Sequence, residues 1–264
     1  MKFSVVTITY NNLEGLLKTS ESVLAQTFED FEWIIIDGGS SDGTVQFLRT
    51  FDRPKISWLS EKDSGIYDAM NKGIKLSNGE YCIFMNAGDS FFDSSVLMSV
   101  SDTIGSRRPA IVYGDACEVA GDKKWYKPAR TPQANFYVMF THHQSLFYLR
   151  QALGAGYDLS YKFSADWALT TRILNTPGTE VLRYHGAICL FERGGISQSQ
   201  KHRKIINAEH WRIYVEESAM NPIVAMVLWT AKVGTNTVRR HAPWLYDLIR
   251  YPRSPAHQEK MDPR

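Results

Sequence analysis

Short apolar runs recur along the first half of the chain, and each has the length of a buried β-strand. They are rich in branched and aromatic residues, which favour strands. They lie at Phe3 to Thr9, Phe31 to Ile36, Ile56 to Leu59, Tyr81 to Met85 and Ala110 to Tyr113. The pattern predicts five strands of one sheet.

Helical spacing of apolar residues fills the intervals between these runs. It covers Leu13 to Gln26, Val45 to Phe51, Ile66 to Leu76 and Ser94 to Ile104. Strands that alternate with helices form parallel βαβ units with right-handed crossovers. We therefore predict an α/β fold with a mainly parallel central sheet flanked by helices.

Acidic residues stand just after three of the predicted strands. Asp37 closes the second strand, Asp63 follows the third, and Asp89 follows the fourth through Asn86-Ala87-Gly88. Open α/β sheets bind ligands at the carboxyl ends of their strands, so these acids should converge there. Asp89 is the first candidate for a ligand to a metal or a metal-bound phosphate, although Asn, Gly and Asp also form ordinary turns and caps.

Structural roles remain open for the other acids. Asp37 has the alternative of holding the glycine turn that follows it. Asp63 is placed to cap the next helix and to meet its dipole, and Asp68 falls on the polar face of that helix.

The loop after the first strand offers Thr7, Thr9, Tyr10 and Asn11, which suit a base and a ribose. It lacks the glycine-rich fingerprint of a dinucleotide-binding turn. This absence argues against a Rossmann dehydrogenase.

The second half of the chain is less regular. Trp125 to Pro132 is interpreted as a basic loop, and Val181 to Leu190 as a strand. His142 and His143 would face opposite ways on a strand, so at most one serves a given site. Asp166 falls in the first turn of a helix that ends near Leu174, either as an acid that stabilises the helix dipole or as a general base.

Charge is distributed unevenly along the chain. The net charge of +2 argues against a nucleic-acid partner, but residues 201–264 carry eleven Lys and Arg against six Asp and Glu. Within them, Lys201 to Glu217 is amphipathic, and an apolar run from Pro222 precedes Val233 to Tyr251. A basic segment with tryptophan and tyrosine beside an apolar run fits peripheral membrane contact. Packing on the catalytic domain or on a second subunit is the alternative, and Pro252 to Arg264 is expected to be disordered.

The three cysteines are far apart and fit no metal or disulfide pattern, which predicts a reducing compartment. The first residues have no signal-peptide pattern, and no apolar run reaches the length of a membrane span. We expect a cytoplasmic protein. Peripheral contact with the inner face of the bacterial cytoplasmic membrane is a further expectation.

The order of motifs resembles the family 2 glycosyltransferases of GT-A fold. The resemblance rests on residues 6–11, 35–44, 61–74 and 84–89, with further similarity at 143–145, 165–167 and 194–197. It covers about residues 3–200, which we take as the catalytic domain, with 201–264 as a helical extension.

The resemblance implies metal-dependent, inverting transfer of a sugar from a nucleotide-diphosphate donor. Donor-side positions would be Asp37 at the base, Thr7, Thr9, Tyr10 and Asn11 around it, and Asp63, Asp68 and Asn86. Asp89 would bind Mn²⁺ or Mg²⁺. Asn86 and Gly88 stand where other members often have aspartates, so a single carboxylate is left for the cation, which donor phosphates and waters can complement.

The acceptor side rests on three residues in the same resemblance. Asp166 matches the position of the general base, while His143 is the fallback base or, with Gln144, an acceptor contact. The implied acceptor is a glycan or lipid-linked oligosaccharide of cell-surface polysaccharide or lipopolysaccharide. UDP is the favoured nucleotide and GDP its competitor. The rival interpretations are a sugar nucleotidylyltransferase and a catalytically weak nucleotide-sugar-binding module.

Overall fold

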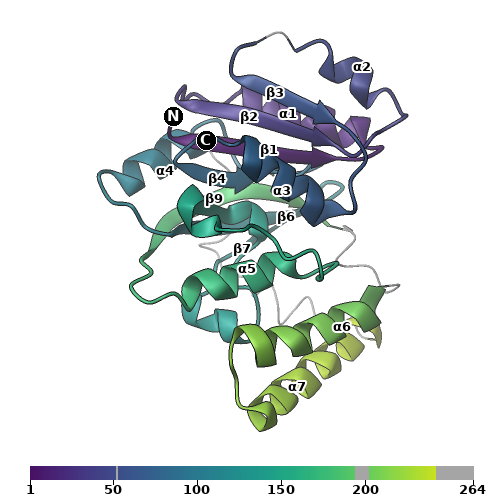
Figure 1. Ribbon diagram of the computed structural model, residues 1–264, viewed down its shortest axis with the longest axis vertical. Coiled ribbons are helices and arrows are strands. Elements are labelled where there is room, and N and C mark those ends of the chain that lie inside the picture. The colour runs from purple at the N-terminus through teal and green to yellow at the C-terminus, as the bar shows by residue number, and fades with distance from the viewer. Residues whose placement is uncertain (52, 194–201, 242–264) are drawn as a thin grey trace.

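A nine-stranded sheet with helices on both faces forms the body of the protein (Figure 1). The computed structural model describes residues 1–51, 53–193 and 202–241. The strand order is β3-β2-β1-β4-β8-β6-β9-β5, and β7 pairs with β6 outside this path. The α/β prediction is therefore confirmed.

The first half of the chain forms the parallel part of the sheet. Its elements are β1 (Phe3–Thr9), α1 (Leu13–Leu24), β2 (Phe31–Asp37), α2 (Thr44–Leu48), β3 (Ile56–Ser60), α3 (Ile66–Leu76) and β4 (Tyr81–Phe84). All pairings among these four strands are parallel, as predicted. The helix α2 is shorter than the pattern predicted.

The second half adds strands of mixed direction. Its elements are β5 (Ser90–Phe91), α4 (Val96–Ile104), β6 (Ile111–Ala120), β7 (Lys123–Lys127), β8 (Leu146–Leu149), α5 (Ala165–Leu174) and β9 (Val181–Glu192). The strand β8 lies antiparallel between β4 and β6, and β9 runs parallel to β6.

Two sequence predictions are wrong in this half. The basic segment that begins at Trp125 is not all loop, because β7 pairs antiparallel with the extended end of β6. Its lysines fit an edge strand, where charged side chains reach solvent and block further pairing. His142 and His143 do not lie on a strand, because a short 3-10 turn occupies His143–Ser145.

The strands alternate between two apolar cores. Tyr81 and Ile83 belong to the core on the side of α1, α2 and α4, whereas Cys82 and Phe84 belong to the core on the side of α3 and α5. The alternation follows from the two-residue period of a strand. The first half of the sheet therefore supports both helical layers.

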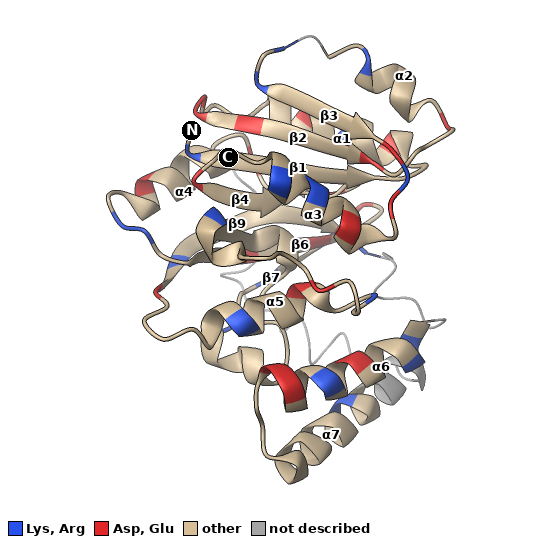
Figure 2. Cartoon of the chain, viewed as in Figure 1, with Lys and Arg blue, Asp and Glu red and all other residues tan. Residues whose placement is uncertain are grey.

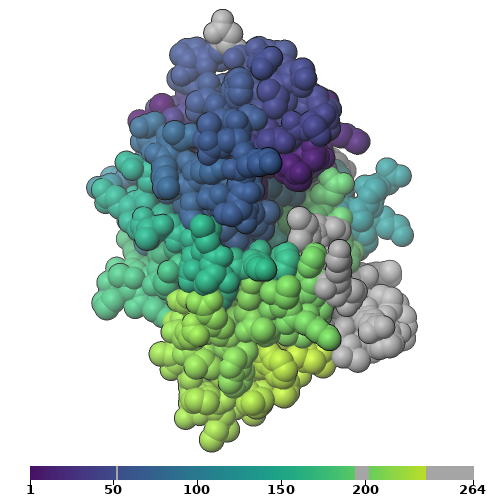
Figure 3. All heavy atoms as spheres, turned by 45° about the vertical axis from the view of Figure 1, so that its right-hand side comes forward, coloured from purple at the N-terminus to yellow at the C-terminus, as the bar shows by residue number. Residues whose placement is uncertain are grey.

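The C-terminal helices complete the second of these cores. They are α6 (Arg203–Arg212), a π-helical turn (Ile213–Glu217) and α7 (Pro222–His241). Ile213 and Tyr214 are fully buried, and the Tyr214 ring meets the Trp167 ring of α5 edge to face. Figure 3 shows these helices at the end of the molecule remote from the N-terminal half.

A long helix follows the π-helical turn in the C-terminal half. The apolar run from Pro222 and the segment from Val233 are one helix as far as His241. The similar motif at residues 194–197 and the disorder predicted from Pro252 lie outside the described residues. Within the described residues, no helix combines the length and hydropathy needed to cross a bilayer.

Candidate active site

The carboxyl ends of β1 to β4 open on one large cavity of about 1490 Å³. Tyr10, Gly38, Asp63 and Asn86, each from the loop after one of these strands, line it. Asp89 lines it as well, so two of the three acids that were predicted to converge share its wall. This is the position at which open α/β sheets bind ligands.

The turn that carries Asp89 is held by α1 and β1. The Thr19 hydroxyl donates to the Asp89 carbonyl (2.6 Å) and the Asn86 carbonyl (3.1 Å) and accepts from the Gly88 N–H (3.1 Å). Asn12 donates to the Ala87 carbonyl at 3.1 Å. Gly88 has φ +106°, in the region that favours glycine, so an aspartate there would be strained.

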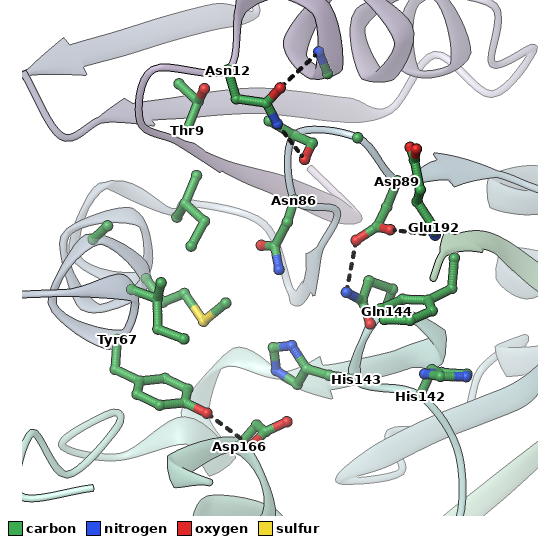
Figure 4. Close-up of a pocket in the computed structure, with 18 of the residues that line it drawn as sticks. Thr9, Asn12, Tyr67, Asn86, Asp89, His142, His143, Gln144, Asp166 and Glu192 are labelled. Atoms are coloured by element: carbon green, nitrogen blue, oxygen red, sulfur yellow. Dashed lines mark hydrogen bonds between the residues drawn. The ribbon is translucent and has the colours of Figure 1, made fainter. Parts of the chain in front are cut away.

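The Asp89 carboxylate is buried at the cavity wall and already has two hydrogen-bond donors. The Gln144 amide donates to Oδ2 at 2.7 Å, and the Glu192 N–H donates to Oδ1 at 3.1 Å (Figure 4). Burial raises the pKa of Asp89 to about 7, against the effect of these hydrogen bonds. A nearby cation would favour the ionised form that a metal ligand needs.

Two buried oxygen atoms in the same wall have no hydrogen-bond partner within the described residues. They are Oδ1 of Asn86 and Oγ1 of Thr9. Because buried polar atoms are nearly always paired, such orphaned atoms indicate a place for a ligand. Among the described residues, no three His, Cys, Asp or Glu side chains gather as a metal site. A hard cation at Asp89 and Asn86 would take its remaining oxygen ligands from donor or water.

Two other predicted donor residues lie behind the wall. Asp37 is fully buried and accepts hydrogen bonds from Ser40 and, at 2.6 Å, from the Ser60 hydroxyl. Thr7 is also fully buried, and its hydroxyl accepts from the Trp33 indole at 2.9 Å. In this structure Asp37 holds the glycine turn, and neither side chain lines the cavity.

The other predicted donor-side residues also fall into two groups: those that line the cavity and those that lie outside its wall. Thr9, Tyr10 and Asp63 line the cavity. Asn11 is exposed outside the wall, where its amide oxygen accepts from the Ser41 N–H at 2.9 Å. Asp68 also lies outside the wall, and its carboxylate accepts from the Ser64 N–H at 2.9 Å, which lowers the pKa of Asp68.

Asp166 lies across the cavity from Asp89, on the first turn of α5 (Figure 4). Its Oδ1 accepts a hydrogen bond from the Tyr67 hydroxyl at 2.9 Å. The half-buried carboxylate therefore combines a fixed oxygen with access to the cavity.

His143 and Gln144 lie between these two acids, and both line the cavity. The Nε2 atom of His143 lies 2.8 Å from the Tyr157 hydroxyl, and its ring stacks on Phe84. Burial lowers the pKa of His143, so the imidazole is neutral at pH 7. Gln144 is committed to Asp89 in this structure.

Several residues of the site were missed in the sequence. They are Asn12, Thr19, Tyr67, Lys127 and Glu192. Thr19 and Tyr67 fall within helical patterns that predict only packing, and Glu192 ends a strand distant in sequence. Only Lys127 carried a signal, as part of the basic segment, and it lines the cavity beside Arg130.

A mainly parallel first half-sheet with an acid-bearing turn above a cavity at its strand ends defines a GT-A-like fold. Residues 4–173 match the profile of "Glycosyl transferase family 2". The chain belongs to this family, so the resemblance found in the sequence is confirmed.

A relative supports this assignment, and solved structures support the fold. A PGL/p-HBAD biosynthesis glycosyltransferase of Mycobacterium bovis is 30% identical over 204 residues, which cover 75% of this chain and 79% of the relative. The fold resembles S. aureus TarS 1-349 in complex with UDP (TM-score 0.65, 17% identity, 98% of this chain and 77% of that chain). It also resembles a mannosyltransferase of Pyrobaculum calidifontis in complex with GDP-Man and Mn²⁺ (TM-score 0.60, 14% identity, 91% and 76%).

The orphaned hydroxyl of Thr9 gives a stability prediction with a control on the same strand. Thr9→Val should leave the unfolding free energy of the ligand-free protein unchanged or raise it, because the hydroxyl has no partner to lose. Thr7→Val should lower it by about 1–3 kcal/mol, because the Trp33 N–H loses its acceptor. Urea unfolding measures both, and equal destabilisation by the two variants would contradict the assignment.

Proposed function

We propose that the protein transfers a sugar from a nucleotide-diphosphate donor to a hydroxyl of a glycan or lipid-linked oligosaccharide, with inversion at the anomeric carbon. The observation that carries the proposal is the shared cavity of Asp63 and Asp89, from two separate loops, and Asp166, from the first turn of α5. Two acids lie on the side of the strand ends, and the third faces them from α5. This arrangement supports a donor held on one side and a base on the other.

The donor would lie along the strand ends. Thr9 and Asn86 offer oxygen atoms without partners, and Tyr10 is an exposed ring at the rim. UDP is the favoured nucleotide, in keeping with the UDP complex of the similar S. aureus TarS, and GDP is the alternative, in keeping with the Pyrobaculum mannosyltransferase. Asp37, Asn11, Asp68 and Thr7 stay predicted donor-side residues.

Asp89 and Asn86 would hold a divalent cation, Mn²⁺ or Mg²⁺, together with the donor. When bound, such a cation neutralises the charge that develops on the diphosphate leaving group. Because Asp89 is a single carboxylate with two hydrogen-bond donors, its affinity for a cation without nucleotide should be weak.

Asp166 would act as the general base. Inversion requires the acceptor hydroxyl to attack from the side opposite the leaving group, and Asp166 lies across the cavity from Asp89. A carboxylate in that place can take the proton of the attacking hydroxyl. The neutral His143 beside it would contact the acceptor, together with Gln144 after a change of partner.

Asp166→Asn should reduce turnover by about 10²- to 10⁴-fold, which is the usual contribution of a general base. Nucleotide affinity should stay within about twofold of the parent, because Asp166 lies across the cavity from the donor side. The measurement is a panel of UDP- and GDP-sugars, assayed for nucleotide release and by calorimetry. Asp102→Asn, an exposed change on α4, is the matched control.

The same panel separates the rival functions. A nucleotide-sugar-binding module would bind a donor without turnover, so Asp166→Asn would have no activity to remove. A sugar nucleotidylyltransferase would require nucleoside triphosphate and release pyrophosphate. Full turnover in Asp166→Asn would remove the assigned base.

Asp89→Asn should abolish the gain in nucleotide affinity that Mn²⁺ provides. The substitution removes the carboxylate charge with little change in shape, so the loss would report the cation rather than packing. Calorimetry of UDP and GDP binding with Mn²⁺ and with EDTA measures the effect, again with Asp102→Asn as control. An unchanged Mn²⁺ effect in Asp89→Asn would place the cation elsewhere.

The helical extension, residues 201–264, would make peripheral contact with the inner face of the cytoplasmic membrane. Exposed aliphatic side chains gather at the start of α7, where Ile223 and Val227 are 76% and 62% exposed. The sequence of α7 contains no acidic residue, and Arg239 and Arg240 stand near its end. Lys232 faces the protein instead, where its ammonium lies 3.9 Å from the centroid of the Trp167 ring and donates to the Tyr137 carbonyl. Apolar contact together with positive charge is the combination that binds anionic lipid surfaces. Association with a second subunit is the alternative.

Ile223→Ser combined with Val227→Ser should lower binding to vesicles containing phosphatidylglycerol by about tenfold or more, because two apolar side chains leave the interface. Met98→Ser, at an exposed position on α4, is the control. Vesicle sedimentation measures binding, and gel filtration shows whether the variant changes self-association instead. Equal sedimentation of parent and double variant would remove the membrane proposal. Point variants are preferable to deletion of the helices, because deletion would also remove the buried side chains of Ile206 on α6 and Ala225 on α7.

A further inference from the structure

A tyrosine of α3 holds the carboxylate of Asp166. The Tyr67 hydroxyl donates to Oδ1 of Asp166 at 2.9 Å across 99 positions of sequence (Figure 4). Within the described residues, it is the one hydrogen-bond donor to this carboxylate. The second oxygen, Oδ2, therefore has no protein donor there.

Tyr67 is itself firmly placed. It is 5% exposed, and its ring lies against the Tyr157 ring with centroids 5.4 Å apart. Asn71, one turn further along α3, accepts from the Tyr157 N–H and donates to its carbonyl, both at 2.8 Å. The Tyr157 hydroxyl in turn meets His143 at 2.8 Å. The Tyr67 ring is thus held by Tyr157, whose backbone is held in turn by Asn71 of α3.

Tyr67 is also a permanent donor. Burial, together with the charge of Asp166, raises the pKa of the Tyr67 hydroxyl well above its usual value. The phenol is therefore protonated at neutral pH. It can donate to Asp166 but does not compete with it as a base.

We propose that Tyr67 is the positioning residue for Asp166, an inference that rests on the proposed role of Asp166 as general base. By binding Oδ1, Tyr67 selects one side-chain rotamer and directs Oδ2 into the cavity. In the transfer step a bond forms between the acceptor oxygen and the anomeric carbon, and the bond from that carbon to the diphosphate oxygen breaks. The bonding electrons leave with the diphosphate, and the acceptor proton passes to Oδ2.

This contact joins the two sides of the cavity through one helix. Asp63 lines the donor side and its carboxylate accepts from the Gly65 N–H at 3.0 Å, just before α3 begins. Tyr67 follows in the first turn of the same helix. The start of α3 thus links the donor-side loop, which leads into it, to the base, which Tyr67 contacts; a fixed separation of the two is the geometric requirement for in-line attack.

The test is a double-mutant cycle of Tyr67→Phe and Asp166→Asn. Tyr67→Phe keeps the buried ring and removes only the hydroxyl, so kcat should fall about 10- to 100-fold. The KM for the nucleotide sugar that gives the fastest hydrolysis in the panel should change little. In the Asp166→Asn background, single-turnover rates with enzyme in excess should show no further loss from Tyr67→Phe.

Tyr81→Phe is the matched control, because it removes a buried hydroxyl that binds the Pro109 carbonyl in the other core. It should leave kcat unchanged. Thermal unfolding of each variant separates lost folding from lost positioning. An unchanged kcat in Tyr67→Phe, or an equal loss in both backgrounds, would overturn the inference. Undiminished activity of Asp166→Asn alone would instead overturn the proposed base, so the two failures are distinguishable.

Discussion

The active-site side of this protein depends on the hydrogen bonds of one buried threonine. Thr19 ties the Asn86–Asp89 turn to α1, and the parallel pairing of β1 with β4 holds the same turn from the other side. Polar backbone groups that leave a buried strand must find partners, and here a helix side chain supplies them. The carboxylate of Asp89 therefore occupies a fixed place before any ligand arrives.

The two halves of the chain contribute different parts of the site. The parallel half supplies the strand ends and the turn of Asp89, whereas the second half supplies Asp166 on α5. The layers meet because α3, from the first half, packs in the same core as α5. The Tyr67 to Asp166 hydrogen bond is a polar contact between these two helices, at the edge of their shared core (Figure 4).

Much of the fold could be predicted from periodicity, because buried strands and amphipathic helices leave local patterns. The strand-end acids Asp63 and Asp89 could be placed by the same logic. Thr19 and Tyr67 could not, since each acts on a partner far away in sequence and resembles a packing residue locally. The strand β7 was not predicted because its lysines resemble those of a polar loop. Charged side chains are nevertheless common on edge strands, where they face solvent. Unlike β7, the first half of α7 carries almost no charged residues (Figure 2).

The shared core of α5 and the C-terminal helices has an evolutionary consequence. The family profile ends at residue 173, yet Ile213, Tyr214 and Ala225 complete the core that begins before it. The C-terminal helices cannot be exchanged between homologues as a separate unit unless the side chains of α5 that pack against them change as well. Changes in this part of the molecule are therefore tolerated best on the outward side of α7, away from the shared core.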